Sequence, residues 1–260
     1  DHIKKGDFLA ACGNSGRSPE PHIHFQVQST PFIGSKTLDY PLSHYISETS
    51  GRKDYHFFDY PREGALVQKT EILKSVSKAF HLLPGQILRF KISGSNELDR
   101  IESWEIKTDY FNNSYFDCVE NRAKAYFVND GNVFYFTNFI GNRKTFLFRF
   151  FIGAHRIVFH VDDEIKYEDE IPLHLYSNSL YRYFNDFIAP FYNSMHLYHR
   201  SSITTYEASD NKATVNSKIE ENRFGKSIAG MKFYIEVEEN KIVSCQYNYK
   251  NKSITAECID

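Results

Sequence analysis

Beyond residue 50 the chain is a succession of short segments rich in Phe, Tyr, Ile and Val, separated by polar turn signals such as those at 129–132 and 141–143. Aromatic and β-branched residues in short runs between turn residues are typical of antiparallel strands. The spacing therefore predicts an antiparallel sheet, a sandwich or a partial barrel. The carboxyl-terminal part predicts a meander with strands over 213–219, 231–237, 242–249 and 253–259.

One helix is predicted within this β-rich region, over residues 179–192. Its apolar residues recur at intervals of three and four, and Asn178 can cap its start. We expect this helix to pack across a sheet. The residues that form its apolar face are Leu180, Tyr183, Phe184, Phe187, Ile188 and Phe191.

Composition and charge restrict the function. The 260 residues are 41% hydrophobic and 25% charged, which is typical of soluble globular domains. The net charge is −2 and like charges form no long block, so nucleic acid is not an expected partner. The longest apolar stretch, 146–152, is interrupted by Arg149 and is far shorter than the roughly 20 residues that span a membrane. No membrane-spanning segment is expected in this piece.

The four cysteines are too few and too scattered for a disulfide scaffold or a paired-cysteine metal site. We expect Cys12 and Cys118 to be buried thiols. Cys245 and Cys258 lie on predicted neighbouring strands that flank the turn 250–252. A disulfide between these two remains open.

The amino-terminal region has its own pattern. Residues 7–12 predict a strand, 13–16 a turn, and 22–28 a second strand, which together make one antiparallel hairpin. The polar run 47–54 is the best candidate for a domain boundary. We therefore expect two parts, residues 1–50 and residues 51–260, the second a β-rich domain of unassigned role.

His22 and His24 are the residues of chemical interest. Side chains two positions apart on a strand project from the same face, so two imidazoles can share one site. In a zinc hydrolase one such histidine binds the metal, while its neighbour hydrogen-bonds the reacting group. An H-x-H pair alone is a weak signal, because two such histidines are more often ordinary hydrogen-bonded residues.

The string around this pair, Gly-Asn-Ser-Gly-Arg-Ser-Pro-Glu-Pro-His-Ile-His-Phe-Gln-Val at 13–27, closely resembles the signature of the lysostaphin-type zinc metallopeptidases. Residues 1–7 and 38–41 resemble the segments that enter and leave it, so the resemblance covers about residues 1–46. It implies the last part of an antiparallel peptidase sheet. It also implies that His24 is a zinc ligand, that His22 is catalytic, and that loop residues shape the substrate groove: Asn14, Ser15 and Arg17.

The family cleaves peptide cross-links of peptidoglycan, so the resemblance implies a cell-wall endopeptidase in the cell envelope, in the periplasm, with wall peptides as partners. One feature departs from the family. Its H-x-x-x-D motif, which supplies the other ligands, is missing before His22, and His44 with Glu48 or His160 with Glu164 lie downstream in the wrong order. We expect the remaining zinc ligands upstream of Asp1, because no signal segment precedes the globular sequence.

Two alternatives stay open. In the first, the domain is a non-catalytic module that binds wall peptides or regulates a partner. The piece also resembles the soluble tail of larger membrane proteins, such as urea-transporter-like chains that carry this peptidase domain.

Overall fold

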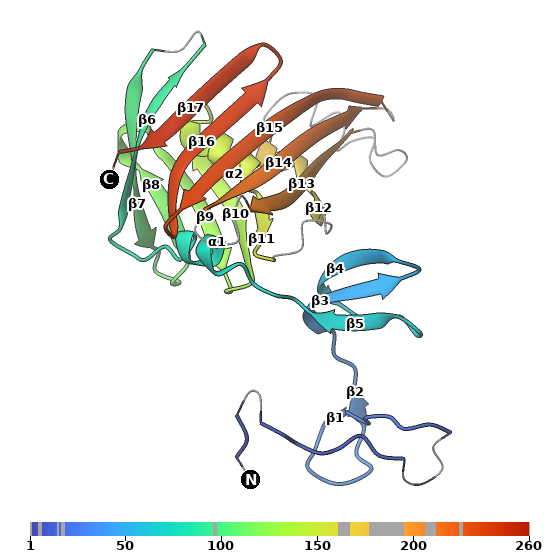
Figure 1. Cartoon of the computed structure of the whole chain (residues 1–260). Helices are drawn as coiled ribbons and strands as arrows, with labels where there is room; N and C mark the ends of the chain where they lie inside the picture. The colour runs from blue at the N-terminus through green and yellow to red at the C-terminus, as the bar shows by residue number, and fades with distance from the viewer. Residues whose placement is uncertain are drawn as a thin grey trace.

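A computed structural model of the chain describes residues 2–4, 7–14, 16, 19–95, 98–160, 167–176, 195–205, 212–223 and 226–259 (Figure 1). These residues form a mainly β protein, with antiparallel sheets of twelve, three and two strands and a few short helices. No helix in this part of the chain is long and apolar enough to cross a membrane.

The twelve-stranded sheet consists of two meanders, one over β6–β11 and one over β12–β17, that join where β6 pairs with β17. Every neighbouring pair is antiparallel. The strands are β6 (Ile87–Gly94), β7 (Arg100–Thr108), β8 (Ser114–Cys118), β9 (Ala123–Asn129), β10 (Val133–Gly141), β11 (Arg156–Val158), β12 (Tyr167–Glu170), β13 (Met195–Thr205), β14 (Lys212–Arg223), β15 (Lys226–Glu238), β16 (Lys241–Tyr249) and β17 (Lys252–Cys258).

The sheet curls into a nearly closed barrel, because its two edge strands, β11 and β12, come together. Side chains bridge the remaining gap. The Ser201 hydroxyl on β13 donates to the Arg156 carbonyl at 3.1 Å. Arg156 Nη1 donates to the Tyr167 hydroxyl at 2.8 Å and lies 3.0 Å from Asp169 Oδ2. Arg156 is therefore the main polar link across the barrel seam.

Helix α2 (Phe146–Gly153) runs inside the barrel, between the wall formed by β9 and β10 and the wall formed by β14–β16 (Figure 1). Six of its eight residues are buried, so the helix fills the interior with apolar side chains. Thr145 caps its start, accepting from the Phe148 amide at 3.2 Å. This helix was not predicted, because a short apolar run is equally compatible with a buried strand.

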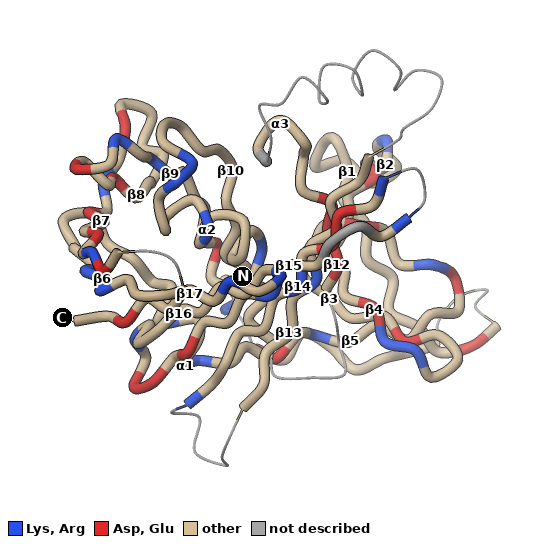
Figure 2. The backbone as a smooth tube through the Cα atoms, turned by 90° about the horizontal axis from the view of Figure 1, so that it is seen from above, with Lys and Arg blue, Asp and Glu red and all other residues tan. Residues whose placement is uncertain are grey.

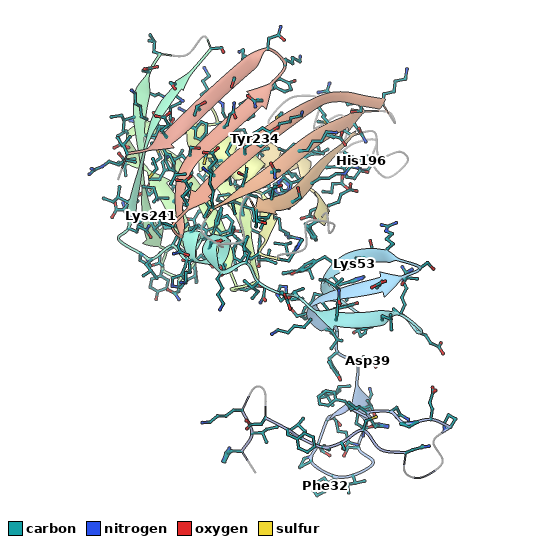
Figure 3. All side chains as sticks on the ribbon, viewed as in Figure 1. Phe32, Asp39, Lys53, His196, Tyr234 and Lys241 are labelled. Atoms are coloured by element: carbon teal, nitrogen blue, oxygen red, sulfur yellow. The ribbon has the colours of Figure 1, made fainter. Side chains whose placement is uncertain are left out.

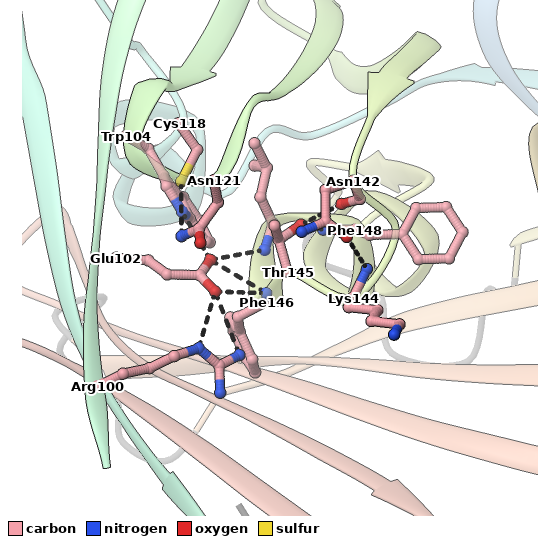
Figure 4. Close-up of polar contacts among 11 residues, drawn as sticks. Arg100, Glu102, Trp104, Cys118, Asn121, Asn142, Lys144, Thr145, Phe146 and Phe148 are labelled. Carbon is pink, nitrogen blue, oxygen red and sulfur yellow. Dashed lines mark hydrogen bonds and ion pairs between the residues drawn. The ribbon is translucent and has the colours of Figure 1, made fainter. Parts of the chain in front are cut away.

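A buried carboxylate holds the start of α2 (Figure 4). Glu102 on β7 is 1% exposed and accepts from the amide of Phe146 at 2.9 and 3.0 Å and from that of Leu147 at 3.2 Å. Arg100 and the Trp104 indole contact the same carboxylate at 3.2 and 3.3 Å. The free amides and the positive end of the helix dipole favour an anion at the start of a helix. The buried charge of Glu102 is also paired with Arg100, which offsets the cost of its burial.

The carboxyl-terminal end of α2 is closely packed. A Cβ on Gly153 would lie 2.2 Å from the ring of Phe233, so only glycine fits here. His199 Nε2 donates to the Gly153 carbonyl at 2.9 Å. Because helix carbonyls at a carboxyl-terminal end lack intrahelical partners, this bond satisfies one of them.

The remaining elements precede or connect the barrel strands. The three-stranded sheet has β3 (Leu42–Thr49) in its centre, between β4 (Arg52–Asp59) and β5 (Leu66–Lys69). The two-stranded sheet pairs β1 (Val27–Gln28) with β2 (Thr37–Leu38). The short helices are α1 (Lys74–Ala79), the 3₁₀ turn η1 (Val119–Asn121) and α3 (Leu173–Tyr176).

Charged residues of both signs are interspersed over the strands (Figure 2). Lys107, for example, lies 2.9 Å from both Glu105 and Asp117 on β7 and β8. Opposite charges on adjacent strands favour the pairing modestly.

The predicted carboxyl-terminal meander is confirmed as β14–β17, with turns at Glu239-Asn240 and around residue 251. The predicted helix at 179–192 lies outside the described residues. All four cysteines are thiols, and Cys12 is exposed. Because Cys245 pairs with Ala256, Cys258 lies two residues further along the neighbouring strand and not opposite it.

One amino-terminal expectation needs correction. The hairpin predicted over 7–12 and 22–28 is reduced to one bridge, between Gly13 and His22. The domain boundary expected near residue 50 is not tested, but the structure shows what the polar run there forms. It forms the turn between β3 and β4, where Ser50 and Gly51 adopt positive φ and Thr49 pairs with Arg52. The division into domains stays a prediction, but residue 50 lies inside a hairpin.

Candidate functional site

The histidines predicted to carry chemistry lie in the extended amino-terminal segment, and both are exposed. His22 Nδ1 lies 3.0 Å from the Glu20 carbonyl oxygen, and His24 Nε2 lies 3.0 Å from Gln26 Oε1. Each ring therefore donates to a neighbour in the sequence. Of the predicted groove residues, Asn14 is exposed, whereas Ser15 and Arg17 lie outside the described residues.

The family resemblance implies that these residues help to hold a zinc ion. A catalytic zinc takes about three protein ligands and one open position. Nowhere in the described part of the chain do three His, Cys, Asp or Glu residues come together as a metal-binding group. His22 and His24 therefore do not form a zinc site by themselves.

The same segment exposes many large apolar side chains. Phe8 is 83% exposed, Ile23 81%, Phe25 73% and Phe32 75%. Figure 3 shows Phe32 at the far end of this segment, away from the barrel. Large apolar side chains exposed along one short segment are candidates for contact with another polypeptide. The backbone of this segment is paired only by the bridge between Gly13 and His22 and by the two-residue strands β1 and β2. Most of its amide and carbonyl groups therefore have no strand partner among the described residues.

A second polar cluster lies where the three-stranded sheet meets the barrel. His44 on β3 has a φ of 55°, which is unusual for a residue other than glycine, and it is left out of the pairing with β4 between Ser43 and Tyr45. His44 Nε2 lies 3.0 Å from Asp130 Oδ2, and His44 Nδ1 lies 2.7 Å from the Tyr55 hydroxyl. Burial, and then the Asp130 carboxylate, raise the pKa of Tyr55, so its hydroxyl stays protonated. The chain Tyr55–His44–Asp130 is thus a hydrogen-bonded link between two sheets.

Arg156 extends this junction. Its guanidinium lies over the rings of Phe57, Tyr135 and Tyr167, at 5.2, 5.1 and 5.8 Å from their centroids. Cation–π contacts of this kind attach the small sheet, through Phe57, to both edges of the barrel. The cluster joins residues far apart in the sequence, so the strand pattern alone could not identify it.

A Ser–His–Asp arrangement on β3 and β4 has the hydrogen-bond order of a serine hydrolase triad. It consists of Ser47, His56 and Asp59. Ser47 Oγ lies 2.7 Å from His56 Nε2, and His56 Nδ1 lies 3.0 Å from Asp59 Oδ2. A triad carboxylate is buried, however, whereas the side chain of Asp59 is 57% exposed. We therefore assign these bonds to holding the hairpin together.

Two further histidines are buried at the barrel seam. His155 and His199 have ring centroids 5.9 Å apart, and neither Nδ1 atom has a partner within the described residues. Burial lowers the pKa of His155 to about 3 and that of His199 to about 4. Both rings are therefore neutral near pH 7.

Comparison with known proteins identifies no relative: no family model matches the chain, and neither does any curated protein or solved structure. The resemblance to lysostaphin-type peptidases therefore depends on the residues of the amino-terminal string.

Proposed function

We propose that residues 1–46 are the closing segment of a lysostaphin-type zinc peptidase domain, which hydrolyses peptide cross-links of peptidoglycan in the periplasm. In this proposal His24 is one zinc ligand, and His22 hydrogen-bonds the reacting carbonyl or its oxyanion. The string at 13–27 that contains both histidines carries the proposal.

The environment of the segment supports it. Its extended backbone exposes Phe8, Ile23 and Phe25, as expected of strands whose neighbours in a sheet are supplied elsewhere. The polypeptide that covers them would also have to bring the missing ligands, in the H-x-x-x-D motif that we place upstream of Asp1. When bound, zinc would lower the pKa of a water molecule to about 7 and so supply hydroxide at neutral pH.

The native protein tests the two histidines separately. His24→Ala should lower both the zinc content, measured by mass spectrometry, and the hydrolysis of purified cross-linked peptidoglycan. His22→Ala should retain zinc but lower kcat by about 10² to 10³, because it removes one positioned hydrogen-bond partner of the oxyanion. His196→Ala, on the barrel, is the control and should change neither quantity.

The outcome that would reverse the assignment is loss of zinc from His22→Ala with retention in His24→Ala. If the native protein lacked zinc and released no wall peptide, the peptidase proposal itself would be wrong.

A non-catalytic module that binds wall peptides is the second candidate. It is favoured by the absence of a three-ligand group among the described residues and by the hydrogen bonds that already engage both histidines. In that case the native protein should sediment with purified peptidoglycan, and His24→Ala should not change the bound fraction. The placement of the chain as the soluble tail of a larger membrane protein remains a separate proposal, which the upstream sequence would test.

A further inference from the structure

Two aromatic side chains are almost completely exposed at the turn between β7 and β8. Tyr110 is 97% exposed and Phe111 81%, with ring centroids 5.6 Å apart at nearly right angles. Single exposed apolar residues are common, but an adjacent pair presented at the tip of a turn is a candidate contact surface. Both side chains are exposed, so neither contributes to the core.

The turn that presents these rings is held by its own hydrogen bonds. Asp109 Oδ1 accepts from the amides of Phe111 and Asn113 at 2.9 Å each, and Asp109 Oδ2 accepts from Asn113 Nδ2 at 3.0 Å. The bonds from Asn113, first from its side chain and then from its amide, lower the pKa of Asp109. The carboxylate form therefore persists at neutral pH. A turn ordered before binding loses little conformational entropy when a ligand stacks on it.

The turn also forms part of a cavity of about 600 Å³, within the size range of ligand pockets. The cavity lies between α1, the start of β8 and the end of β9. The described residues of its lining carry amide, hydroxyl, imidazole and ammonium groups and include no Asp or Glu. The described residues around it are Ser77, Lys78, His81, Leu82, Asn112, Asn113, Ser114, Phe127, Val128, Asn129 and Gly131.

Five of these side chains have no hydrogen bond to any described residue: Ser77, Lys78, His81, Asn112 and Ser114. Together they offer hydroxyl, amide and imidazole groups, which both donate and accept, and one ammonium group, which only donates. Asn129, by contrast, is already occupied, because it donates to the Phe80 carbonyl and accepts from the Gly131 amide, both at 2.8 Å. Of these unused polar groups, Asn112 and Ser114 lie next to the aromatic turn, whereas Ser77, Lys78 and His81 lie on α1 and just after it.

We propose that this cavity and the Tyr110–Phe111 turn bind an oligosaccharide of N-acetylated amino sugars. Sugar hydroxyls and acetamido groups both donate and accept hydrogen bonds, as the unused side chains do. The apolar C–H face of a sugar ring can contact the face of an aromatic ring. The described residues of the lining include none of the paired carboxylates that glycoside hydrolases use, so the proposed site binds a glycan without cleaving it.

This inference rests on the proposed function in one respect. The choice of acetamido sugars follows from peptidoglycan as substrate, because its glycan strands consist of N-acetylated amino sugars. The barrel would then hold the glycan strand while the peptidase segment acts on the attached peptides.

Isothermal titration of the 260-residue chain with chitopentaose, an oligomer of five N-acetylglucosamine units, tests the proposal. Cellopentaose, which has the same linkage but lacks acetamido groups, is the comparison ligand. We expect saturable binding of chitopentaose that is at least about tenfold tighter than that of cellopentaose. The double variant Tyr110→Ala, Phe111→Ala should weaken chitopentaose binding by about tenfold or more, the loss expected for stacked rings.

The matched control is Phe58→Ala, which removes an aromatic ring that is 66% exposed on β4, away from the cavity, and should leave the affinity unchanged. A second variant, Ser114→Ala, tests the cavity without altering the aromatic turn and should also weaken binding. The proposal is wrong if chitopentaose does not bind, if cellopentaose binds equally well, or if the double variant retains the affinity. Because this assay needs neither zinc nor bond cleavage, its failure is distinguishable from failure of the peptidase proposal.

Discussion

Removal of the Glu102 carboxylate should destabilise the barrel more than any other single change of charge that we describe. Glu102→Ala leaves the amides of Phe146 and Leu147 without their acceptor at the buried start of α2. It also leaves Arg100 and the Trp104 indole without their partner. Breaking a buried and hydrogen-bonded charge pair from one side typically costs about 3–5 kcal/mol. For a unit of this size, that cost lowers Tm by about 6–20 °C.

Urea unfolding followed by circular dichroism, beside calorimetry, measures both quantities. Glu102→Gln retains an acceptor oxygen for the helix amides but loses the charge, so its cost should be lower, about 1–3 kcal/mol. Glu105→Ala is the matched control on the same strand. Its partly exposed ion pair with Lys107 should contribute no more than about 1 kcal/mol.

A result in which Glu102→Ala and Glu105→Ala were equally stable would refute the reasoning. The start of α2 would then be satisfied by water or by other groups, and the carboxylate would not hold the helix in the barrel.

Two further predictions concern the other end of α2 and the seam. Gly153→Ala should lower the free energy of unfolding by about 1–3 kcal/mol, because its Cβ would lie 2.2 Å from the Phe233 ring. The control, Gly230→Ala, should change that free energy little, because the nearest atom to its Cβ would be 3.9 Å away. Equal urea midpoints for the two variants would contradict this prediction. Burial holds the pKa of His155 at about 3 and that of His199 at about 4 in the folded protein, below the unfolded value of about 6.5. As the pH falls, the unfolded chain therefore binds protons before the folded protein does. The free energy of unfolding should consequently decrease as the pH drops from about 6.5 towards 4. His199→Gln should make the decline in urea midpoint over that range shallower, and an unchanged slope would count against titration of this residue.

Local sequence was sufficient for the β character of the chain and for its carboxyl-terminal meander. In β14–β17 the apolar residues alternate with polar ones, and turn residues such as Glu239, Asn240 and Lys250 adopt the positive φ that short turns require. These properties depend on neighbours within a few residues, so they can be derived from the sequence. The H-x-H spacing of His22 and His24 is likewise evident from the sequence alone.

Only the tertiary structure determined how these elements combine. The run 146–153 is apolar enough for a buried strand, and it is a helix whose amides meet a carboxylate 44 residues away on β7. The joining of the two meanders by β6 and β17, and the contact of Arg156 with Tyr167 across the seam, are likewise long-range. Sequence periodicity carries no information on such pairings, because it records which face of an element is apolar and not what covers it.

The amino-terminal segment is a second case in which the sequence does not determine what covers an apolar face. Its sequence predicts strands with one apolar face, but the described structure contains no layer to bury Phe8, Ile23 and Phe25. The two histidines consequently hydrogen-bond to Glu20 and Gln26 in their own segment. Sequence determined which residues this segment could offer to a metal or a substrate. Whether they converge on a site depends on the packing of further polypeptide against that face, because burial is what fixes strand register and brings distant ligands together.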